Sequence, residues 1–286
     1  MISQQQLIRM VESIPPFPES VHQVLSLTAS VDCAPKALVK VIEHDPILTA
    51  EVLRLVNSAY FGLSRHVTSI NHAVVYVGIN TVKNVAIALS TKGALPAKNT
   101  AGLDMRQFWE HSLTVGVLAR LLAAPRAAGE INEANYFVAG LLHDIGKILF
   151  AHFIPQEYRQ VAESLADYGY DELATERAVL GTDHCQAGAM LAEKWKLPTS
   201  LVRSIRFHHD VEAADEQSPE LYATAAANLA AHLVSAARAT PGAGGDHVVV
   251  PEVLRAWLGD ELPQVVNGIV GLSEEIDKAK AFIEVV

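Results

Sequence analysis

Apolar residues recur at helical spacing along most of the chain, and start signals for helices divide the pattern into segments. Asp45-Pro46 is one such signal, with Asp as the N-cap and Pro at the first helical position. The apolar positions that follow keep an approximately helical spacing, at Ile47, Leu48, Val52, Leu55 and Val56. Residues 247–250 are too short a stretch to predict a strand. The pattern therefore favours helices over sheets.

The first half of the chain is expected to form a smaller helical subdomain at residues 1–95. The segment Ile14-Pro15-Pro16-Phe17-Pro18 cannot be helical, because proline lacks a backbone N–H and its ring clashes with the preceding turn. Short helices are predicted to begin near Glu19, Pro35, Pro46, His72 and Asn80. Residues 93–103 contain Gly, Pro, Lys and Asn and are interpreted as a linker.

The second half, residues 104–286, is expected to form a larger helical core with a helical C-terminal extension. Longer helices are predicted at about 105–123, 133–151, 155 onward, 170–180, 183–195, 198–209 and 221–237. A flexible loop is expected at 240–250, and the tail from Pro251 is predicted to be helical again. Together the two halves predict an all-α fold.

Composition narrows the expected partners and compartment. The formal net charge is −10, which disfavours broad attraction to nucleic acids or anionic membranes, so neither is expected as a partner. Cys33 and Cys185 form no paired motif, and the N-terminus lacks a signal-peptide pattern, so a reducing, cytoplasmic location is expected. Residues 221–237, the most apolar long stretch, are interpreted as a buried helix because they are short for a membrane span.

Candidate chemistry is concentrated in the second half. Six residues of types that bind divalent metals occur there in an ordered series: His111, His143-Asp144, His184 and His208-His209. Each lies near the end of a predicted helix, so ligands from different helices can converge on one polar centre. Taken singly, each is more typical of a helix cap or a core histidine. Cys185 has no partner cysteine and is interpreted as core. The other histidines are interpreted as structural or surface groups: His22, His44, His66, His72, His152, His232 and His247.

The segment around the His-Asp pair, residues 141–147, suggests how a cation could be held. Adjacent helix positions point about 100° apart, so His143 and Asp144 could grip one ion beside the helix. Gly146 would let another backbone or a ligand approach closely. Lys147 could meet a phosphate or pair with a carboxylate. The alternative is a helix end in which His143 and Asp144 form a local hydrogen bond.

The ordered His/Asp series resembles that of the HD superfamily of metal-dependent phosphohydrolases. The N-terminal half is similar to a narrower group, the HDOD family, which is the HD-related output domain of bacterial signalling proteins. The segments that carry this resemblance are Ile14-Pro-Pro-Phe-Pro, Glu43-His-Asp-Pro-Ile-Leu-Thr, Leu53-Arg-Leu-Val-Asn-Ser-Ala-Tyr-Phe-Gly and Ile70-Asn-His-Ala-Val-Val-Tyr-Val-Gly. The resemblance extends from about residue 14 to residue 235.

The resemblance implies an all-α, HD-like bundle in a bacterial, cytoplasmic regulatory protein with protein partners. It also implies one or two divalent metal ions, Fe, Mn, Ni or Zn. The implied metal ligands are His111, His143, Asp144, His184, His208, His209 and Asn228. Asn228 stands where HD hydrolases usually supply an Asp, and its amide oxygen is a neutral, weaker ligand. The Gly-Tyr-Pro segment of cyclic-di-GMP phosphodiesterase relatives is replaced after the double histidine by Asp210-Val-Glu-Ala-Ala-Asp.

Two functions are compatible with this pattern. The one we favour is a non-catalytic output domain that binds a partner protein, with the His/Asp centre holding a structural metal or a small signalling ligand. The other is a metal-dependent phosphohydrolase or phosphodiesterase that acts on a nucleotide or cyclic nucleotide, with Lys147 as the candidate phosphate contact. No Gly-rich phosphate loop is evident, so the sequence predicts no particular substrate.

Overall fold

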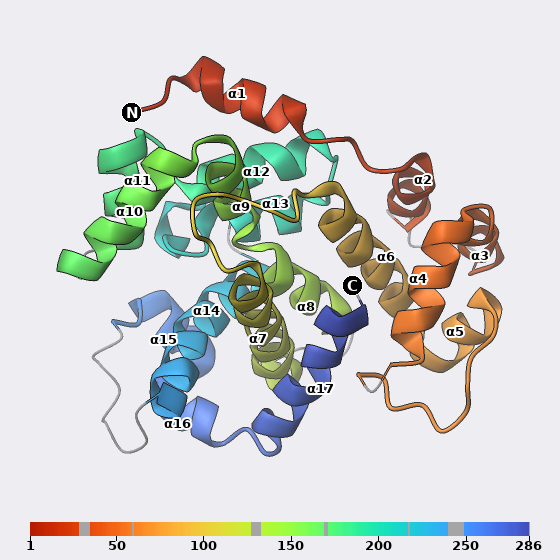
Figure 1. Cartoon of the computed structure of the whole chain (residues 1–286). Coiled ribbons are helices and arrows are strands. Elements are labelled where there is room, and N and C mark those ends of the chain that lie inside the picture. Colours follow the sequence, from red (N-terminus) through yellow and green to blue (C-terminus); the bar gives the residue numbers. More distant parts are fainter. Residues whose placement is uncertain are drawn as a thin grey trace.

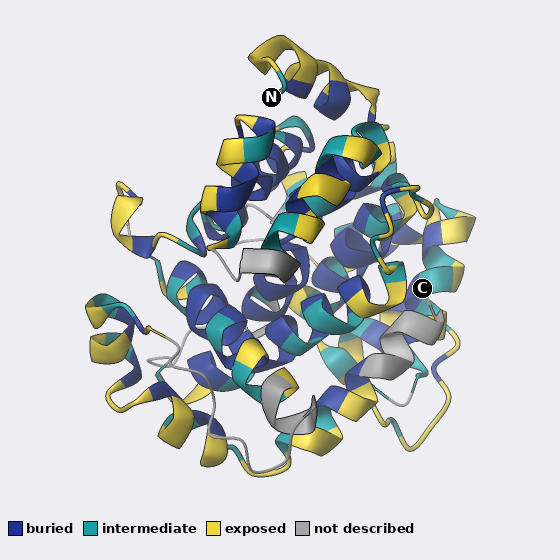
Figure 2. Ribbon diagram, turned by 60° about the vertical axis from the view of Figure 1, so that its left-hand side comes forward, coloured by how far each residue is buried: buried dark blue, intermediate teal, exposed yellow. Residues whose placement is uncertain are grey.

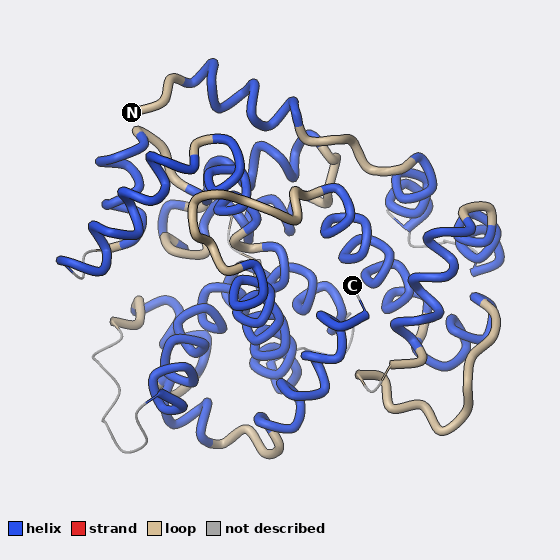
Figure 3. Tube along the Cα trace, viewed as in Figure 1, coloured by secondary structure: helices blue, strands red, loops and turns tan. Residues whose placement is uncertain are grey.

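All regular secondary structure in the described part of the chain is helical. The computed structural model describes residues 1–28, 35–58, 60–126, 133–168, 171–216, 218–239 and 249–285. Within these ranges the chain forms α-helices and two short 3-10 helices, and no β-strand (Figure 3). The predicted all-α fold is confirmed.

The helices of the N-terminal half do not all lie together. Helices α2 to α6 gather on one side of the molecule, whereas α1 lies apart from them and packs on α12 (His184–Lys194) of the core (Figure 1). Helix α1, which the sequence analysis did not predict, begins with a capping box between Ser3 and Gln6. The bounds are α1 (Gln4–Ser13), α2 (Glu19–Thr28), α3 (Pro35–Glu43), α4 (Pro46–Val56), α5 (Ile70–Val77) and α6 (Ile79–Ala94).

The non-helical segment at Ile14–Pro18 joins the two sides of the molecule. Phe17 is buried and stacks on Trp195, with ring centroids 4.5 Å apart and an angle of 17° between the rings. The indole N–H of Trp195 donates a hydrogen bond to the carbonyl of Pro15 (2.9 Å). The Nζ of Lys194 donates to the carbonyls of Val11 and Glu12 at the end of α1. The end of α12 therefore holds the connection between α1 and α2.

Helix α4 begins as the sequence predicts. The carboxylate of Asp45 accepts hydrogen bonds from the backbone N–H groups of Ile47 and Leu48. Its other oxygen accepts a hydrogen bond from the hydroxyl of Ser20 on α2 (2.7 Å). Asp45 therefore caps one helix and joins it to another.

The loop between α4 and α5 is held by a single asparagine. The side-chain amide of Asn57 donates to the carbonyls of Leu53 and Val67, and its oxygen accepts from the backbone N–H of Val67. This pairs the end of α4 with the chain just before α5.

Helices α5 and α6 meet at a sharp bend. Gly78, with φ at +84°, lies between them in a backbone region that side chains other than glycine rarely adopt. No single helix in the described residues is long and apolar enough to cross a membrane. Helices α5 and α6 taken together have the length and the apolar composition of a membrane span, but the chain bends by 116° between them.

The core is built around α7 (Met105–Ala123), which packs against α8 (Glu133–Leu142) and α14 (Pro219–Ala239). Gly116 of α7 and Gly140 of α8 allow the two backbones to touch, because a Cβ atom at position 140 would lie 2.7 Å from the Cα of Gly116. Buried residues are concentrated on these central helices (Figure 2). This close contact fixes the end of α8 relative to α7.

Smaller helices surround this centre. Helix α17 packs against α7, where Arg120 forms an ion pair with Glu275 (2.6 Å). The predicted helical tail is found as three helices, and most of the predicted loop at 240–250 lies outside the described residues. The remaining bounds are α9 (Ile145–Phe153), α10 (Pro155–Tyr168), α11 (Glu172–Leu180), α13 (Thr199–Phe207), α15 (Glu252–Leu258), α16 (Leu262–Asn267) and α17 (Leu272–Val285).

The predicted single helix at 133–151 is wrong. It is broken at His143-Asp144 into α8 and α9, and Asp144 has φ −100° and ψ 8°, outside the helical region. The break turns both side chains toward the interior, where His143 is fully buried and Asp144 nearly so. The pair is therefore presented by a turn between two helices, and not by adjacent positions on the side of one helix.

Candidate metal centre

The six His/Asp residues of the ordered series come together inside the core. They arrive from four places: His111 from α7, His143 and Asp144 from the turn between α8 and α9, His184 from the start of α12, and His208 and His209 from the end of α13. Most lie at helix ends, as the sequence analysis expects. Imidazole and carboxylate groups are common ligands of divalent metals, so this convergence could form a metal site.

Asp144 stands at the centre of the cluster. Its Oδ2 lies 3.6 Å from Nε2 of His111 and 3.3 Å from Nε2 of His143. Its Oδ1 lies 3.2 Å from Nε2 of His184 and 3.5 Å from Nε2 of His208. One carboxylate therefore faces two pairs of imidazoles, one pair on each of its oxygens.

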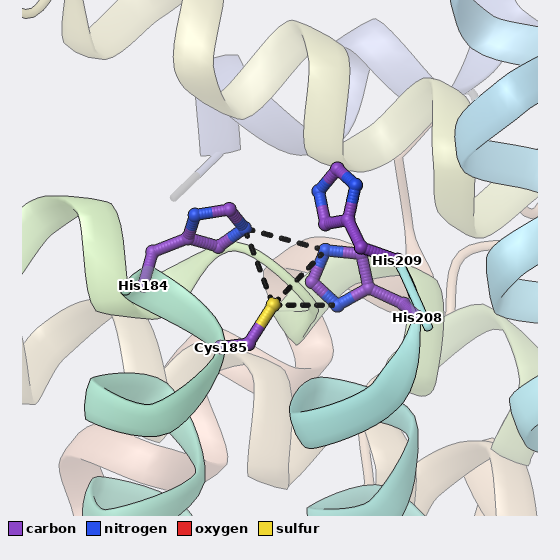
Figure 4. A group of neighbouring side chains, drawn as sticks. All are labelled: His184, Cys185, His208 and His209. Atoms are coloured by element: carbon purple, nitrogen blue, oxygen red, sulfur yellow. Dashed lines mark hydrogen bonds between the residues drawn. The ribbon is translucent and has the colours of Figure 1, made fainter. Parts of the chain in front are cut away.

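Among the described residues, three groups of donor atoms could hold a metal ion, and in each group the atoms all lie within 4.8 Å of one another. Two of them adjoin at Asp144: His111, His143 and Asp144 form the first, and His184, Cys185, His208 and His209 form the second. The third is Glu172, Glu176 and His184. Figure 4 shows the side chains of the second group.

Unsatisfied polar atoms in this cluster also fit a cation. The Nε2 of His209 is buried without a hydrogen-bond partner among the described residues, whereas the buried Nε2 of His143 and Oδ1 of Asp144 have only the ion-pair contacts of 3.2–3.5 Å given above. A buried polar atom without a partner costs about 1–3 kcal/mol. A divalent ion that these atoms bind would satisfy them, so the residues present fit a metal.

Backbone carbonyl oxygens orient two of the buried rings. Nδ1 of His143 lies 2.7 Å from the carbonyl oxygen of Gly140, and Nδ1 of His208 lies 3.0 Å from that of Ile205. An N–H at Nδ1 can donate to these oxygens, which leaves Nε2 on the side that faces Asp144. This is the arrangement by which metal-binding histidines are usually held.

Glu176 of α11 orients His184 and was missed by the sequence analysis. It is fully buried, and its Oε2 accepts from the backbone N–H of His184 and lies 2.7 Å from Nδ1 of the same ring. No spacing rule connects a residue on one helix with the first residue of the next. The only signal in the sequence is an acidic residue in a short helix directly before the Asp183-His184 start.

Lys147 pairs with carboxylates. Its Nζ lies 2.9 Å from Oδ2 of Asp144 and 2.7 Å from Oε1 of Glu172. Burial opposes the charged form, but these two carboxylates outweigh it and raise the pKa of Lys147 well above its ordinary value. The carboxylate-pairing alternative for Lys147 is thus found in the structure. Its contact with a phosphate stays a prediction.

The pKa values of the clustered histidines are shifted in opposite directions. Burial lowers the pKa of His111 to about 3, and the charge of His143 acts in the same direction. Burial, reinforced by the charges of His208 and His184, also lowers the pKa of His209. His111 and His209 are therefore neutral at neutral pH, which is the form that binds metals.

His184 and His208 behave oppositely. Burial lowers their pKa values, but the charge of Cys185 and nearby carboxylates outweigh it, raising the pKa of His184 well above its ordinary value and that of His208 to about 9. Burial opposes ionisation of Cys185, yet His208 and His184 lower its pKa to about 7. Cys185 is buried, as expected of a core residue, but its sulfur contacts both rings. A cation bound here would displace protons, so binding would be pH-dependent.

Helix α14 lies beside the first group through His232. His232, interpreted from sequence as structural or surface, has its ring centroid 5.8 Å from that of His111. Asn228 is buried one helical turn earlier, and residues four apart share a face of a helix. The proposed ligand role of Asn228 stays a prediction.

Gly146 fixes the separation of α9 and α12. A Cβ atom at this position would overlap the carbonyl oxygen of His184 and lie 2.8 Å from the backbone nitrogen of Gly188. The sequence analysis predicts a close approach at Gly146, and the structure shows that the approaching group is the backbone that carries His184. The absence of a side chain here lets Asp144 and His184 meet.

Comparison with known proteins places this geometry in a family. The HDOD domain family matches residues 14–211. A protein of Treponema pallidum (strain Nichols), described as uncharacterized, is 27% identical over 217 residues, which are 76% of this chain and 41% of that protein. The chain therefore spans about two fifths of the length of this relative.

Solved structures show the same fold. A proposed phosphohydrolase of Shewanella amazonensis SB2B is 26% identical with a TM-score of 0.75, over 98% of this chain and 97% of that one. A proposed signal-transduction protein of Marinobacter aquaeolei VT8 has a TM-score of 0.76 at 24% identity, over 100% of this chain and 62% of that one. With the match at residues 14–211 and a shared all-α HD-like architecture, this chain belongs to the HDOD family.

Proposed function

We propose that this chain is a regulatory HDOD domain that binds one or two divalent cations at the His/Asp centre and acts through protein partners in the bacterial cytoplasm. The observation that carries the proposal is the pair of ligand groups that adjoin at Asp144. The family, and the resemblance to a proposed signal-transduction protein, support the regulatory role.

A bound cation would act as a clamp on the core. The first group would hold it through His111, His143 and Asp144, which joins α7 to the α8–α9 turn. The second group would join the start of α12 to the end of α13. Since the ligands come from different helices, a cation would fix the relative positions of these helices. A partner protein could then bind to the surface that they form. Mn, Fe, Ni and Zn all accept imidazole and carboxylate ligands.

Two observations favour a non-catalytic role. Lys147, the basic side chain nearest to Asp144, is bound between two carboxylates, so a phosphate would have to compete with both. Asn228 supplies no negative charge at the position where hydrolytic relatives are expected to have Asp.

Metal analysis of the purified protein tests the metal site. We expect the wild type to retain a transition metal through gel filtration and to melt at a lower temperature after chelation, because a ligand that binds only the folded state stabilises it. Asp144→Ala should lose the metal and the effect of chelation. His66→Ala, which changes an exposed histidine in the α4–α5 loop, is the matched control. A wild type that binds none of the four metals would contradict the metal site.

The retention of both ligand groups favours a second candidate, hydrolysis of a phosphodiester. Two neighbouring cations can stabilise attacking and leaving oxygens, which is the chemistry that the groups would support when loaded. The test is turnover of a chromogenic phosphodiester and of cyclic dinucleotides with each metal. Turnover that Asp144→Ala and His184→Ala both abolish would overturn the non-catalytic role and leave the metal site standing.

A further inference from the structure

A cavity of about 780 Å³ lies between the N-terminal helices and the core, away from the His/Asp centre. Helices α2 and α6 form one wall, and α8, α13 and the turn after α12 form the other. This volume falls in the range of small-molecule sites, roughly 300–1,000 Å³. The cavity thus has the size and the inter-subdomain position that are common for ligand sites.

The walls of this cavity contribute positive charge from both sides. Lys83 comes from α6 and Lys196 from the turn after α12, against a single acidic residue, Glu19. In a chain with a net charge of −10, two lysines that line one cavity are a local exception. Cations on facing walls attract an anion that lies between them.

Hydrogen-bonding groups surround these lysines. The Oδ1 of Asn135 on α8 accepts from Nζ of Lys83 (3.4 Å) and from Nδ2 of Asn84 (3.3 Å), which links the two walls. Asn84 is itself buried. Leu25, Ile87 and Leu201 add apolar surface to the same lining. The lining therefore suits a ligand with an anionic group and a less polar body that also carries hydrogen-bonding groups.

Lys196 occupies this wall in a left-handed backbone conformation. Its φ is +56°, and it is the one described residue other than glycine with a positive φ. Lys196 is the C′ residue of α12, where the N–H of Leu197 donates to the carbonyl of Ala192, so the left-handed backbone belongs to the end of the helix. Glycine is the usual residue at such a position, so Lys196→Gly is compatible with this backbone.

We propose that this cavity binds a small phosphorylated metabolite, with Lys83 and Lys196 on its phosphate and the amides and apolar residues on its organic part. The three core elements of the cavity each carry metal ligands at their far ends. Asn135 precedes His143 on α8, Ser200 precedes His208 on α13, and Lys196 follows the helix that begins at His184. Along α8 and α13 the separation is about 12 Å at 1.5 Å per residue. The two sites are therefore separate but share the same helices.

Calorimetric titration of the full chain tests this site with three probes: adenosine monophosphate, glucose 6-phosphate and inorganic phosphate. We expect at least one organic phosphate to bind with a Kd below about 1 mM and more tightly than inorganic phosphate. Lys196→Gly should weaken it about tenfold, because it removes a charged partner while remaining compatible with the left-handed backbone. Lys83→Gln should weaken it similarly and can keep the hydrogen bond to Asn135.

Lys98→Gly is the matched control, because it makes the same change of charge at an exposed position outside the cavity. It should bind as the wild type does. Binding of no probe, or equal binding by wild type, Lys196→Gly and Lys83→Gln, would overturn the proposal. So would inorganic phosphate binding as tightly as the organic probes. Binding that chelation or Asp144→Ala abolishes but Lys196→Gly leaves intact would assign the ligand to the metal centre instead.

Discussion

The two halves of the molecule differ in the polar side chains that they bury. Among the described residues, the N-terminal helices bury Asn84 and Thr91 but no ionisable side chain. The core buries a whole set of ionisable residues: His143, Asp144, Glu176, Asp183, His184 and His208. A buried charge is expensive unless it is paired and hydrogen-bonded. The core therefore has an energetic cost that the N-terminal half avoids, and this cost arises where the candidate metal ligands meet.

The family-specific segments of the N-terminal half serve structure. Asp45 of the Asp-Pro segment caps α4 and receives a hydrogen bond from Ser20. Asn57 of the Asn-Ser-Ala segment closes the α4–α5 loop. Phe17 of the Pro-Pro-Phe-Pro segment stacks on Trp195. The comparison teaches that these segments identify the fold, whereas the less specific His-Asp pair carries the candidate chemistry.

The largest effect is expected at Glu176. Glu176→Ala removes the carboxylate that holds His184 and leaves Nδ1 of this buried ring without its acceptor. We expect the free energy of unfolding to fall by about 3–5 kcal/mol, the range for a broken buried pair. Metal affinity should fall about 10–100-fold, since the orientation of His184 is lost. Urea denaturation and metal titration measure the two effects.

Glu163→Ala is the matched control, because Glu163 lies exposed on α10. It should change the unfolding free energy by less than about 0.5 kcal/mol. If the two variants unfold alike, the buried carboxylate of Glu176 does not stabilise the core.

The next largest change in stability is expected from substituting two helical glycines, one in each half. Gly146→Ala places a methyl group against the carbonyl oxygen of His184, so we expect a loss of about 3 kcal/mol. Gly93→Ala in α6 meets no atom within 4 Å, so it should stabilise the protein by about 0.5–1 kcal/mol through helix propensity. Thermal unfolding of both variants gives the comparison. Equal tolerance at the two positions would contradict the close α9–α12 contact.

Local signals predicted the fold well where local interactions decide it. Helix α4 starts at Pro46 because Asp45 caps it, and α14 covers the predicted apolar stretch at 221–237. The break at His143-Asp144 was not predictable in this way, since apolar spacing continues through residues 133–151. The break lies beside the close approach of the His184 backbone to Gly146, which is a contact between distant segments.

The convergence of the six His/Asp residues was predictable from the sequence, but the other polar residues around them were not. The ordered series named the six residues that meet around Asp144, because ligand chemistry is visible in residue type. Glu176 and Glu172 were missed, since they act through His184 and Lys147 on other helices. The position of His232 beside His111 depends on how α14 packs on α7. These contacts depend on tertiary packing, and no local sequence pattern indicates them.

The smallest effect is expected at Asp45, the half-buried carboxylate of the N-terminal half. Asp45→Ala removes the cap of α4 and should lower the unfolding free energy by about 1 kcal/mol at neutral pH. Burial opposes its ionisation, but hydrogen bonds from Leu48, Ser20 and Ile47 outweigh it and lower the pKa of Asp45. A lowered folded-state pKa means that the charge stabilises the fold above the unfolded value of about 3.9. That part of the stability is lost as the pH falls through the folded pKa.

The difference in unfolding free energy between the wild type and Asp45→Ala should therefore become smaller in acid. Urea denaturation at pH 7 and below pH 4 would measure it. Asp45→Asn is the matched control, because Asn caps helices about as well as Asp and carries no charge to titrate. The difference in unfolding free energy between Asp45→Asn and Asp45→Ala should not change with pH. If Asp45→Ala proves as damaging as Glu176→Ala, a partly exposed cap would stabilise as much as a buried ion pair. The contrast between the halves would then lie in hydrogen bonding alone and not in the burial of charge.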